Sequence, residues 1–150
     1  AADARAEGAD ILILARSDAR HDHGLDEALT RMAEFHRLGA DILFVEAPRD
    51  EAEMRRICTE LDGPCMANIV EGGMTPALTP AELEQIGFKI AAYPLTLMAA
   101  GMKGMMQALE AFKTGVPVSD LLMPFAELKT RIGFDDYFEE EQKYAAQREG

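Results

Sequence analysis

Residues 41–46 read DILFVE, a run of four apolar residues between two acidic ones. A continuous apolar run of this length is typical of a strand that is buried on both faces, as in a parallel sheet. Similar runs occur upstream in residues 11–16 (ILILAR) and downstream in residues 65–69 (CMANI) and 88–93 (FKIAAY). The chain therefore has four candidate buried strands.

Helical segments separate these strands. Apolar side chains recur at three- and four-residue spacing over residues 25–38, and further helices are predicted over 51–61, from the Thr79-Pro80 cap to Gly87, and over 95–113. Strand–helix alternation with short connections predicts a parallel α/β architecture. A doubly wound open sheet fits the same alternation, but no Gly-rich dinucleotide fingerprint follows any strand. Four units are half of a (β/α)8 TIM barrel, which needs about 250 residues.

The ends of the chain have a different character. Residues 1–7 are Ala-rich and predicted to be helical, up to a stop at Gly8. A helix is predicted over 119–130, a turn with aromatic anchors over 133–137 (GFDDY), and a charged helix over 138–148. We therefore divide the chain into a half-barrel over 1–117, holding β/α units 5 to 8, and a C-terminal helical extension over 118–150. This extension is expected to dock on the barrel or on a partner subunit.

Composition excludes several classes of protein. The 150 residues carry a formal net charge of −12, which argues against nucleic acid and against an anionic membrane surface. No apolar run approaches the roughly 20 residues of a membrane span. With two cysteines, Cys58 and Cys65, a disulfide framework is not expected and a cytoplasmic location is predicted, although the two could still meet in space.

The carboxyl ends of the strands carry polar side chains, and in parallel α/β folds the active site forms there. The candidates in chain order are Arg16 and Asp18, then Glu46, then Asn68 with Glu71, Gly72 and Gly73, and finally Tyr93 and Thr96. A salt bridge that closes the rim would also explain a lone charge at such a position. Two charges and an amide at equivalent ends of successive strands favour a functional site.

The residue types point to a small anionic ligand. An arginine such as Arg16 grips a carboxylate bidentately. Glu46 and Asn68 could hydrogen-bond a hydroxyl, a carboxylate or a metal-bound water. Gly72 and Gly73 allow positive φ or a close approach of backbone to a ligand. His21 and His23 could indicate a metal, but histidines in surface loops are more often solvated.

Four stretches together resemble a known family. Residues 13–19 (ILARSDA) with 24–28 (GLDEA), 39–47 (GADILFVEA), 67–76 (ANIVEGGMTP) and the closing 132–137 (IGFDDY) are similar to the isocitrate lyase / phosphoenolpyruvate mutase superfamily. The closer likeness is to its short-chain members, which include methylisocitrate lyase, 2,3-dimethylmalate lyase, oxaloacetate decarboxylase and carboxyphosphoenolpyruvate mutase. The likeness covers nearly the whole chain.

This resemblance implies a (β/α)8 barrel that holds Mg²⁺ or Mn²⁺ and cleaves a carbon–carbon bond beside a pyruvate-type enolate. It implies substrate-binding roles for Arg16, Glu46, Asn68 and, as a less certain match, Thr96. It implies no direct metal ligand in this chain, with Glu46 reaching the metal through water, and a homodimer or homotetramer built through swapped C-terminal helices. The substrate would be a small 2-hydroxy or 2-oxo carboxylic acid.

The family's metal-binding aspartate, Ser-Gly oxyanion turn and gating loop belong to the first half of the barrel. We therefore expect the chain to be the C-terminal half, with the main catalytic groups elsewhere, and to be inactive alone. Two alternatives stay open: a phosphoryl mutase, whose discriminating residues would lie in the gating loop, and a truncated, non-catalytic barrel fragment. The residues do not choose among substrates, or between lyase and decarboxylase.

Overall fold

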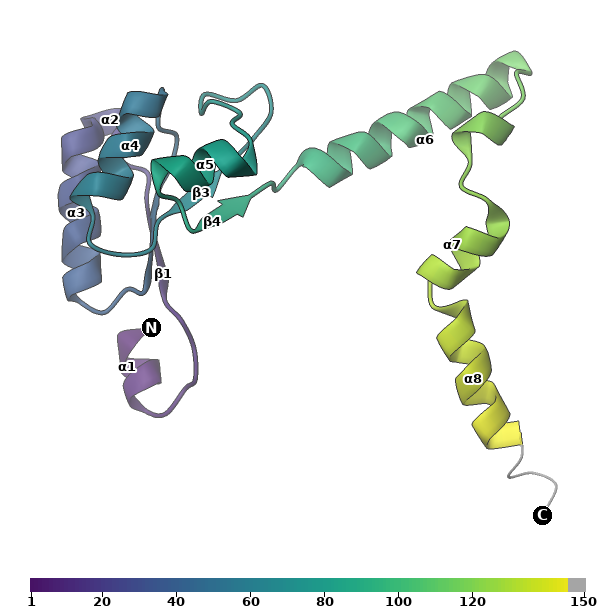
Figure 1. Ribbon diagram of the computed structural model, residues 1–150, viewed down its shortest axis with the longest axis horizontal. Coiled ribbons are helices and arrows are strands. Elements are labelled where there is room, and N and C mark those ends of the chain that lie inside the picture. The colour runs from purple at the N-terminus through teal and green to yellow at the C-terminus, as the bar shows by residue number, and fades with distance from the viewer. Residues whose placement is uncertain (146–150) are drawn as a thin grey trace. The chain divides into compact units, whose positions relative to one another are not determined.

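The computed structural model describes residues 1–145. The chain divides into two compact units, the first over Ala1–Ala99 and the second from Ala100 onward, and each is described by itself. Figure 1 labels the helices α1 to α8 and the strands β1, β3 and β4. The division predicted between residues 117 and 118 separates the half-barrel from the C-terminal extension, and it stays a prediction.

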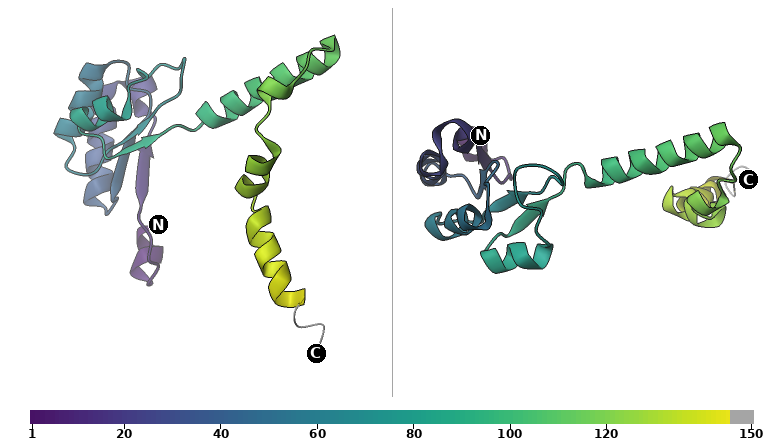
Figure 2. Two further views of the ribbon diagram at one scale, coloured as in Figure 1. Left: turned by 45° about the vertical axis from the view of Figure 1, so that its right-hand side comes forward. Right: turned by 90° about the horizontal axis from the view of Figure 1, so that it is seen from above.

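The first unit repeats a strand followed by a helix. Its elements are α1 (Ala2–Ala6), β1 (Leu14–Ser17), α2 (Ala19–His23), α3 (Leu25–Arg37), β2 (Ile42–Val45), α4 (Glu51–Glu60), β3 (Met66–Asn68), α5 (Pro80–Ile86), β4 (Ile90–Ala92) and the start of α6 (Thr96–Thr114). The helices α3, α4 and α5 lie along one side of the strands (Figure 2).

The four strands are parallel. β1 pairs with β2 in a register that places Arg16 beside Phe44, and β3 pairs with β4 in a register that places Asn68 beside Ala92. A single parallel bridge between Leu43 and Cys65 connects the two pairs. The predicted parallel α/β architecture is therefore confirmed, whereas closure into a barrel would need further strands.

Local sequence signals fix where α4 and α5 begin. The Asp50 side chain accepts a hydrogen bond from the Glu53 amide and so caps α4. At α5, Thr79 and Glu82 form the reciprocal bonds of a capping box, and Pro80 occupies the first turn, where its missing N–H has no cost. The predicted Thr79 cap is confirmed.

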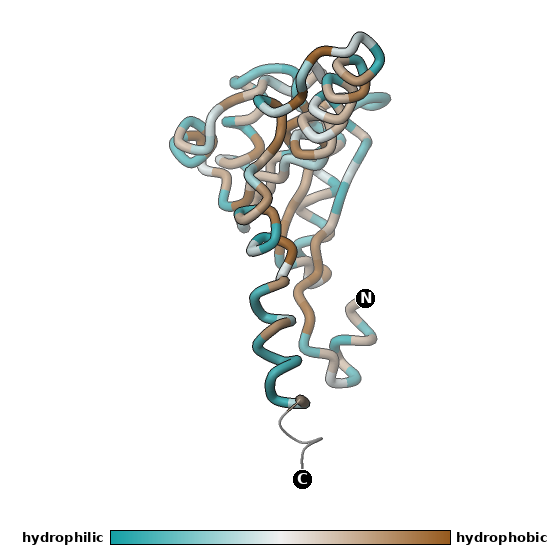
Figure 3. Tube along the Cα trace, turned by 90° about the vertical axis from the view of Figure 1, so that its right-hand side faces the viewer, coloured by the Kyte–Doolittle hydropathy of each residue, from teal (hydrophilic) through white to brown (hydrophobic). Residues whose placement is uncertain are grey.

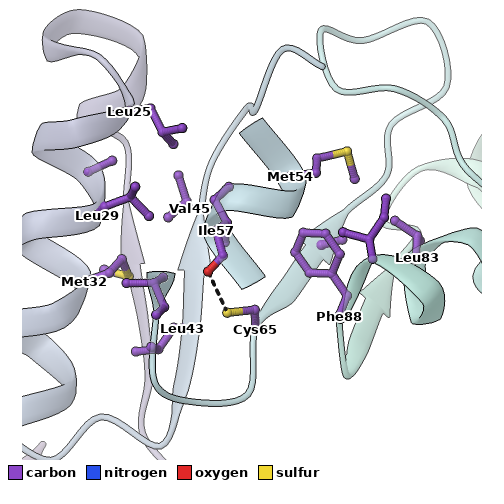
Figure 4. Close-up of a cluster of buried hydrophobic side chains, with 14 of the residues drawn as sticks. Leu25, Leu29, Met32, Leu43, Val45, Met54, Ile57, Cys65, Leu83 and Phe88 are labelled. Carbon is purple, nitrogen blue, oxygen red and sulfur yellow. Dashed lines mark hydrogen bonds between the residues drawn. The ribbon is translucent and has the colours of Figure 1, made fainter. Parts of the chain in front are cut away.

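A single apolar core lies between the strands and helices of the first unit. Its largest fully buried side chains are Met32 from α3, Leu43 from β2, Met54 and Ile57 from α4, Cys65 and Ile69 flanking β3, and Leu83 from α5. Figure 4 labels all of these side chains except Ile69, within the cluster between the helices and the strands. Burial of a large apolar side chain contributes about 1.5–3 kcal/mol, so this cluster holds the strand–helix units together.

Two differences from the predictions concern β1. Ile11 and Leu12 were expected in the strand, but β1 begins at Leu14 and both are exposed, at 47% and 74%. The Ile13 amide donates to the Asp41 carboxylate at 2.7 Å, so this amide binds a side chain, while the Ile13 carbonyl still accepts from the Ile42 amide at 3.1 Å. The apolar stretch leading into β1 is brown in Figure 3. The predicted polar loop after β1 is also wrong, because it contains helix α2.

The second unit is helical. After α6 it contains the 3-10 turn Ser119–Leu121, α7 (Phe125–Arg131) and α8 (Phe134–Ala145). The helix predicted over 119–130 is thus two shorter elements. The turn predicted over 133–137 is wrong beyond Gly133, because α8 starts at Phe134. The rings of Phe134 and Phe138 meet with centroids 5.8 Å apart, and Asp135 and Asp136 favour a helix N-terminus. Of the helix predicted over 138–148, the last residues lie outside the described ones.

Many large apolar side chains of the second unit are exposed. On α6 they include Met102, Met105, Leu109 and Phe112, whose spacing of three and four residues places them along one stripe of the helix. Within the described residues, no helix is long and apolar enough to cross a membrane.

Candidate active site

Arg16 lies at the end of β1 and forms the centre of the candidate site. Its Nε and one terminal nitrogen donate to the two carboxylate oxygens of Asp18, at 3.0 and 2.7 Å. The same terminal nitrogen lies 3.4 Å from Glu46 Oε2. The hydrogen bonds from Arg16 hold the pKa of Asp18 below its usual range. The structure therefore brings together three of the predicted residues, from the ends of β1 and β2.

The guanidinium of Arg16 also lies over the ring of Phe44, with its central carbon 5.1 Å from the ring centroid. The register of β1 and β2 makes these two residues neighbours. Phe44 is only 4% exposed, so the ring is a fixed platform under a cation. In the sequence, Phe44 belongs to an apolar run that predicts a buried strand, and this run alone predicts only a core position. The parallel pairing of the two strands is the signal that identifies its second contact.

Glu46 follows β2 and is joined to β1 by its backbone, since its amide donates to the Ser17 carbonyl at 3.0 Å. Its Oε2 atom is buried and has no hydrogen-bond partner among the described residues. Buried polar atoms almost always have such a partner. Oε2 is therefore available to a water or a ligand that enters the site beside Arg16.

The backbone after Glu46 is unusual. Ala47 has a φ of +56°. Among the described residues, it is the one residue other than glycine with a positive φ. Alanine in this left-handed region costs about 1 kcal/mol or more. Residues in such conformations cluster at functional sites, and this one adjoins the carboxylate with the unpartnered oxygen.

The third and fourth strands contribute a second pair. The Thr96 hydroxyl, at the start of α6, donates to Glu71 Oε1 at 2.6 Å, and this hydrogen bond lowers the pKa of Glu71. Asn68 ends β3, and Tyr93 follows β4 with its side chain partly exposed. Among the residues that the structure describes, no hydrogen bond or ion pair joins this pair to the Arg16 group.

The loop between Asn68 and α5 uses its glycines in two ways. Gly72 has a φ of +79° with open space around it. A Cβ at Gly73 would lie 3.0 Å from the Val70 carbonyl oxygen, which is too close for most side chains. The two glycines thus serve the turn, and Gly72 leaves room for an approaching ligand.

A buried ion pair that the sequence analysis missed holds two of the loops in place. Arg20, on α2, is 3% exposed and donates bidentately to Glu53 of α4, at 2.8 and 2.6 Å. Glu53 also accepts from the Arg49 amide at 2.8 Å, in the loop that follows Glu46. Burial raises the pKa of Glu53, but the bonds from Arg20 and Arg49 outweigh it and leave that pKa lowered.

His21 contacts a neighbouring carboxylate at the surface. His21 Nδ1 lies 2.7 Å from Asp22 at the surface, and within residues 1–145 no group of three or more His, Cys, Asp or Glu side chains is placed to hold a metal. The sequence signal for a His21–His23 metal site therefore gains no support from the geometry.

The sequence profile of the phosphoenolpyruvate phosphomutase family matches residues 1–113. The chain belongs to this family. The 2,3-dimethylmalate lyase of Eubacterium barkeri is 41% identical over 142 residues, which are 93% of this chain and 49% of that protein. The chain thus spans about half the length of the curated relatives that it matches.

Solved structures place the fold in the same superfamily. A crystal structure of 2,3-dimethylmalate lyase, described as a PEP mutase/isocitrate lyase superfamily member, has a TM-score of 0.82 and 29% identity and covers 93% of this chain and 50% of that chain. Oxaloacetate acetylhydrolase in complex with the inhibitor 3,3-difluorooxalacetate has a TM-score of 0.85 and 25% identity, with 94% and 48% covered. The resemblance inferred from the stretches at residues 13–28, 39–47, 67–76 and 132–137 is confirmed.

The Arg20–Glu53 pair gives a prediction for stability. Replacing Arg20 with Met leaves the Glu53 carboxylate half-buried without its partner, and should lower the free energy of unfolding in urea by about 2–4 kcal/mol. The double variant Arg20→Met with Glu53→Met should recover part of that loss. Arg55→Met is the matched control, because Arg55 and Glu51 form an exposed pair at 3.4 Å worth at most about 0.5 kcal/mol. Equal losses for Arg20→Met and Arg55→Met would contradict this role.

The lowered pKa of Glu53 gives a prediction for pH. Because its pKa in the folded protein lies below the ordinary 4.5, the ionised carboxylate stabilises the fold above about pH 4.5 and loses that contribution as pH falls through the folded pKa. The difference in unfolding free energy between the wild type and Glu53→Gln should therefore shrink from about pH 7 to about pH 3. A difference that does not change with pH would argue against the pair.

Proposed function

We propose that this chain is the C-terminal half of a (β/α)8-barrel enzyme, a Mg²⁺-dependent carbon–carbon lyase that cleaves a small 2-hydroxy or 2-oxo di- or tricarboxylic acid. The observation that carries the proposal is the Arg16 guanidinium at the ends of β1 and β2, beside the unpartnered Oε2 of Glu46. The 41% identity to a 2,3-dimethylmalate lyase supports the same class of reaction.

Arg16 has the donors to hold a substrate carboxylate. A guanidinium carries five N–H groups, and two of them are bonded to Asp18. The remaining donors can take a second carboxylate, while Asp18 and the Phe44 ring hold the plane of the group. A fixed plane reduces the entropy lost when the substrate binds, which is how positioning contributes to rate.

The donor set suits a divalent metal held through water. Glu46 offers a hard oxygen that lies 3.4 Å from an Arg16 nitrogen but has no hydrogen bond among the described residues, and hard oxygens are what Mg²⁺ and Mn²⁺ prefer. When bound, the metal would supply Lewis-acid stabilisation of enolate charge. Glu46 would accept a hydrogen bond from a metal-bound water, and Asn68 and Thr96 are proposed to bind substrate oxygens. Asp18, Glu71, Gly72, Gly73 and Tyr93 would complete the wall of the site.

A phosphoryl mutase is the second candidate, and the description of the matching family favours it, since that family is named for phosphoenolpyruvate phosphomutase. The same Arg16 would then bind the carboxylate of a phosphoenolpyruvate-type substrate. The lyase is preferred because the 2,3-dimethylmalate lyase is 41% identical to this chain, whereas a carboxyvinyl-carboxyphosphonate phosphorylmutase that matches a similar share of the chain is 34% identical.

We also propose that the protein is a homodimer or homotetramer assembled through its C-terminal helices. The stripe of Met102, Met105, Leu109 and Phe112 on α6 is exposed, and a helix with such a stripe is stable in water when another surface covers it.

Activity assays on Arg16 variants test the lyase. The protein expressed from the full reading frame that contains this chain should release pyruvate from at least one of three substrates: oxaloacetate, 2-methylisocitrate and 2,3-dimethylmalate. EDTA should abolish this release. Arg16→Ala loses two charge-assisted hydrogen bonds of about 1.5 kcal/mol each and should lower kcat/KM by about 100-fold. Arg55→Ala is the control and should keep wild-type kinetics.

The outcomes separate the candidates. If no substrate gives pyruvate, the lyase proposal fails. Interconversion of phosphoenolpyruvate and phosphonopyruvate, followed by phosphorus NMR, would then support the mutase. An Arg16→Ala enzyme with unchanged kcat/KM would remove Arg16 from the site in either case.

Light scattering tests the assembly. Met105→Glu places a charge in the middle of the apolar stripe and should reduce the molar mass to that of a monomer, because a desolvated charge in an interface is costly. Lys103→Glu, an exposed change on the same helix, should leave the oligomer intact. A monomeric wild-type protein would overturn the proposed assembly.

A further inference from the structure

Two cysteines lie outside the proposed site. Cys58 is in the last turn of α4, and Cys65 stands immediately before β3, whose other end carries Asn68. They are thus at the end of the strand opposite to the candidate active site. Both belong to the packing of the core, with Cys65 fully buried and Cys58 partly exposed beside it.

The backbone holds these two side chains close together. The Sγ atom of Cys65 donates to the Ile57 carbonyl oxygen at 3.7 Å and to the Gly63 oxygen at 3.5 Å, and Figure 4 shows the first contact. A carbonyl oxygen and the next Cα are roughly 2.8 Å apart in a trans peptide, so the Cys65 sulfur lies within about 6.5 Å of the Cys58 Cα. This limit places the Cys65 sulfur beside the last turn of α4, the turn that carries Cys58.

The thiols also perturb one another. Interaction with the neighbouring thiol raises the pKa of Cys58 and lowers the pKa of Cys65, as expected for two neighbouring thiols of which one ionises before the other. Neighbouring chain limits how far Cys58 can move away. An added Cβ at Gly87 would lie 3.0 Å from the Cys58 Cβ, so the end of α5 packs directly against this residue.

We propose that Cys58 and Cys65 form a redox-sensitive dithiol that closes to an intramolecular disulfide when a peroxide or a small disulfide such as oxidised glutathione reaches the pair. With hydrogen peroxide, the two thiols give up two protons and two electrons, one S–S bond forms, the O–O bond breaks and two waters leave. With oxidised glutathione, one thiolate displaces a glutathione thiolate, and the second thiolate displaces the other.

The disulfide would join the last turn of α4 to the first residue before β3. In the reduced protein the same connection rests on the turn Leu61–Pro64 and on core packing. The bond would therefore fix the helix that carries Glu53 to the strand that ends at Asn68. This property belongs to the fold of the first unit and does not depend on the proposed lyase activity.

Peptide mapping in glutathione redox buffers tests the proposal. Trypsin places both cysteines in one peptide, Ile57–Lys89, and a further cut after Glu60 separates them. The oxidised protein should give a tryptic peptide that is lighter by two hydrogens and resists alkylation, and its two halves should stay linked after the cut at Glu60. Cys58→Ser and Cys65→Ser should each leave one thiol open to alkylation.

If the fold favours the disulfide, the bond should form more readily in the native protein than in the unfolded one. The disulfide fraction is therefore measured in native and in urea-unfolded protein at equal ratios of reduced to oxidised glutathione. We expect a larger disulfide fraction in the native protein, because the fold holds the sulfurs together. A native fraction equal to or below the unfolded one would overturn the proposal, as would oxidation of Cys58 to a sulfinic acid while Cys65 stays free.

Discussion

The buried ion pair between Arg20 and Glu53 fixes the loops on which the candidate site is built. Arg20 follows the end of β1 by three residues, and Glu53 lies in the first turn of α4, beyond the end of β2. The Arg49 amide donates to the same Glu53 carboxylate, so the loop between β2 and α4 is held by it as well. Charges removed from water stay ionised only when such partners are in place. Arg16 and Glu46 therefore meet because neighbouring segments on both sides are held, and parallel pairing of β1 with β2 brings their ends to one edge.

Much of this fold could be predicted from the sequence, because its strands and helices depend on local signals. The apolar run of β2 and the Thr79-Pro80 cap specify their elements without distant contacts. Helix α2 could not be found in this way. Its residues show no apolar periodicity, and its place depends on Arg20, whose partner lies 33 positions away in the sequence. The aromatic residues after Gly133 were misread as a turn because glycine and two aspartates are turn-forming residues, whereas here they begin α8.

The candidate site was predictable to the same extent. That Arg16 and Glu46 would be neighbours follows from adjacent parallel strands, whose carboxyl ends share an edge. The contact of Arg16 with Phe44 depends on the register of those strands, and the bond between Thr96 and Glu71 depends on the path of a loop. Neither register nor loop path is encoded in a local pattern. The superfamily structures to which the chain is similar are about twice as long, so the chain aligns with about half of each.

The left-handed backbone at Ala47 restricts which residues can follow Glu46. A β-branched side chain crowds its own backbone at positive φ, so valine, isoleucine and threonine are poorly accommodated there, and the fixed φ of proline is incompatible with it. Glycine would relieve the strain, but it would also free the peptide that orients the Glu46 carboxylate. A saturation library at position 47 would therefore separate stability of the backbone from orientation of the Glu46 carboxylate. The glycine variant would have the least strained backbone and would hold the carboxylate least firmly.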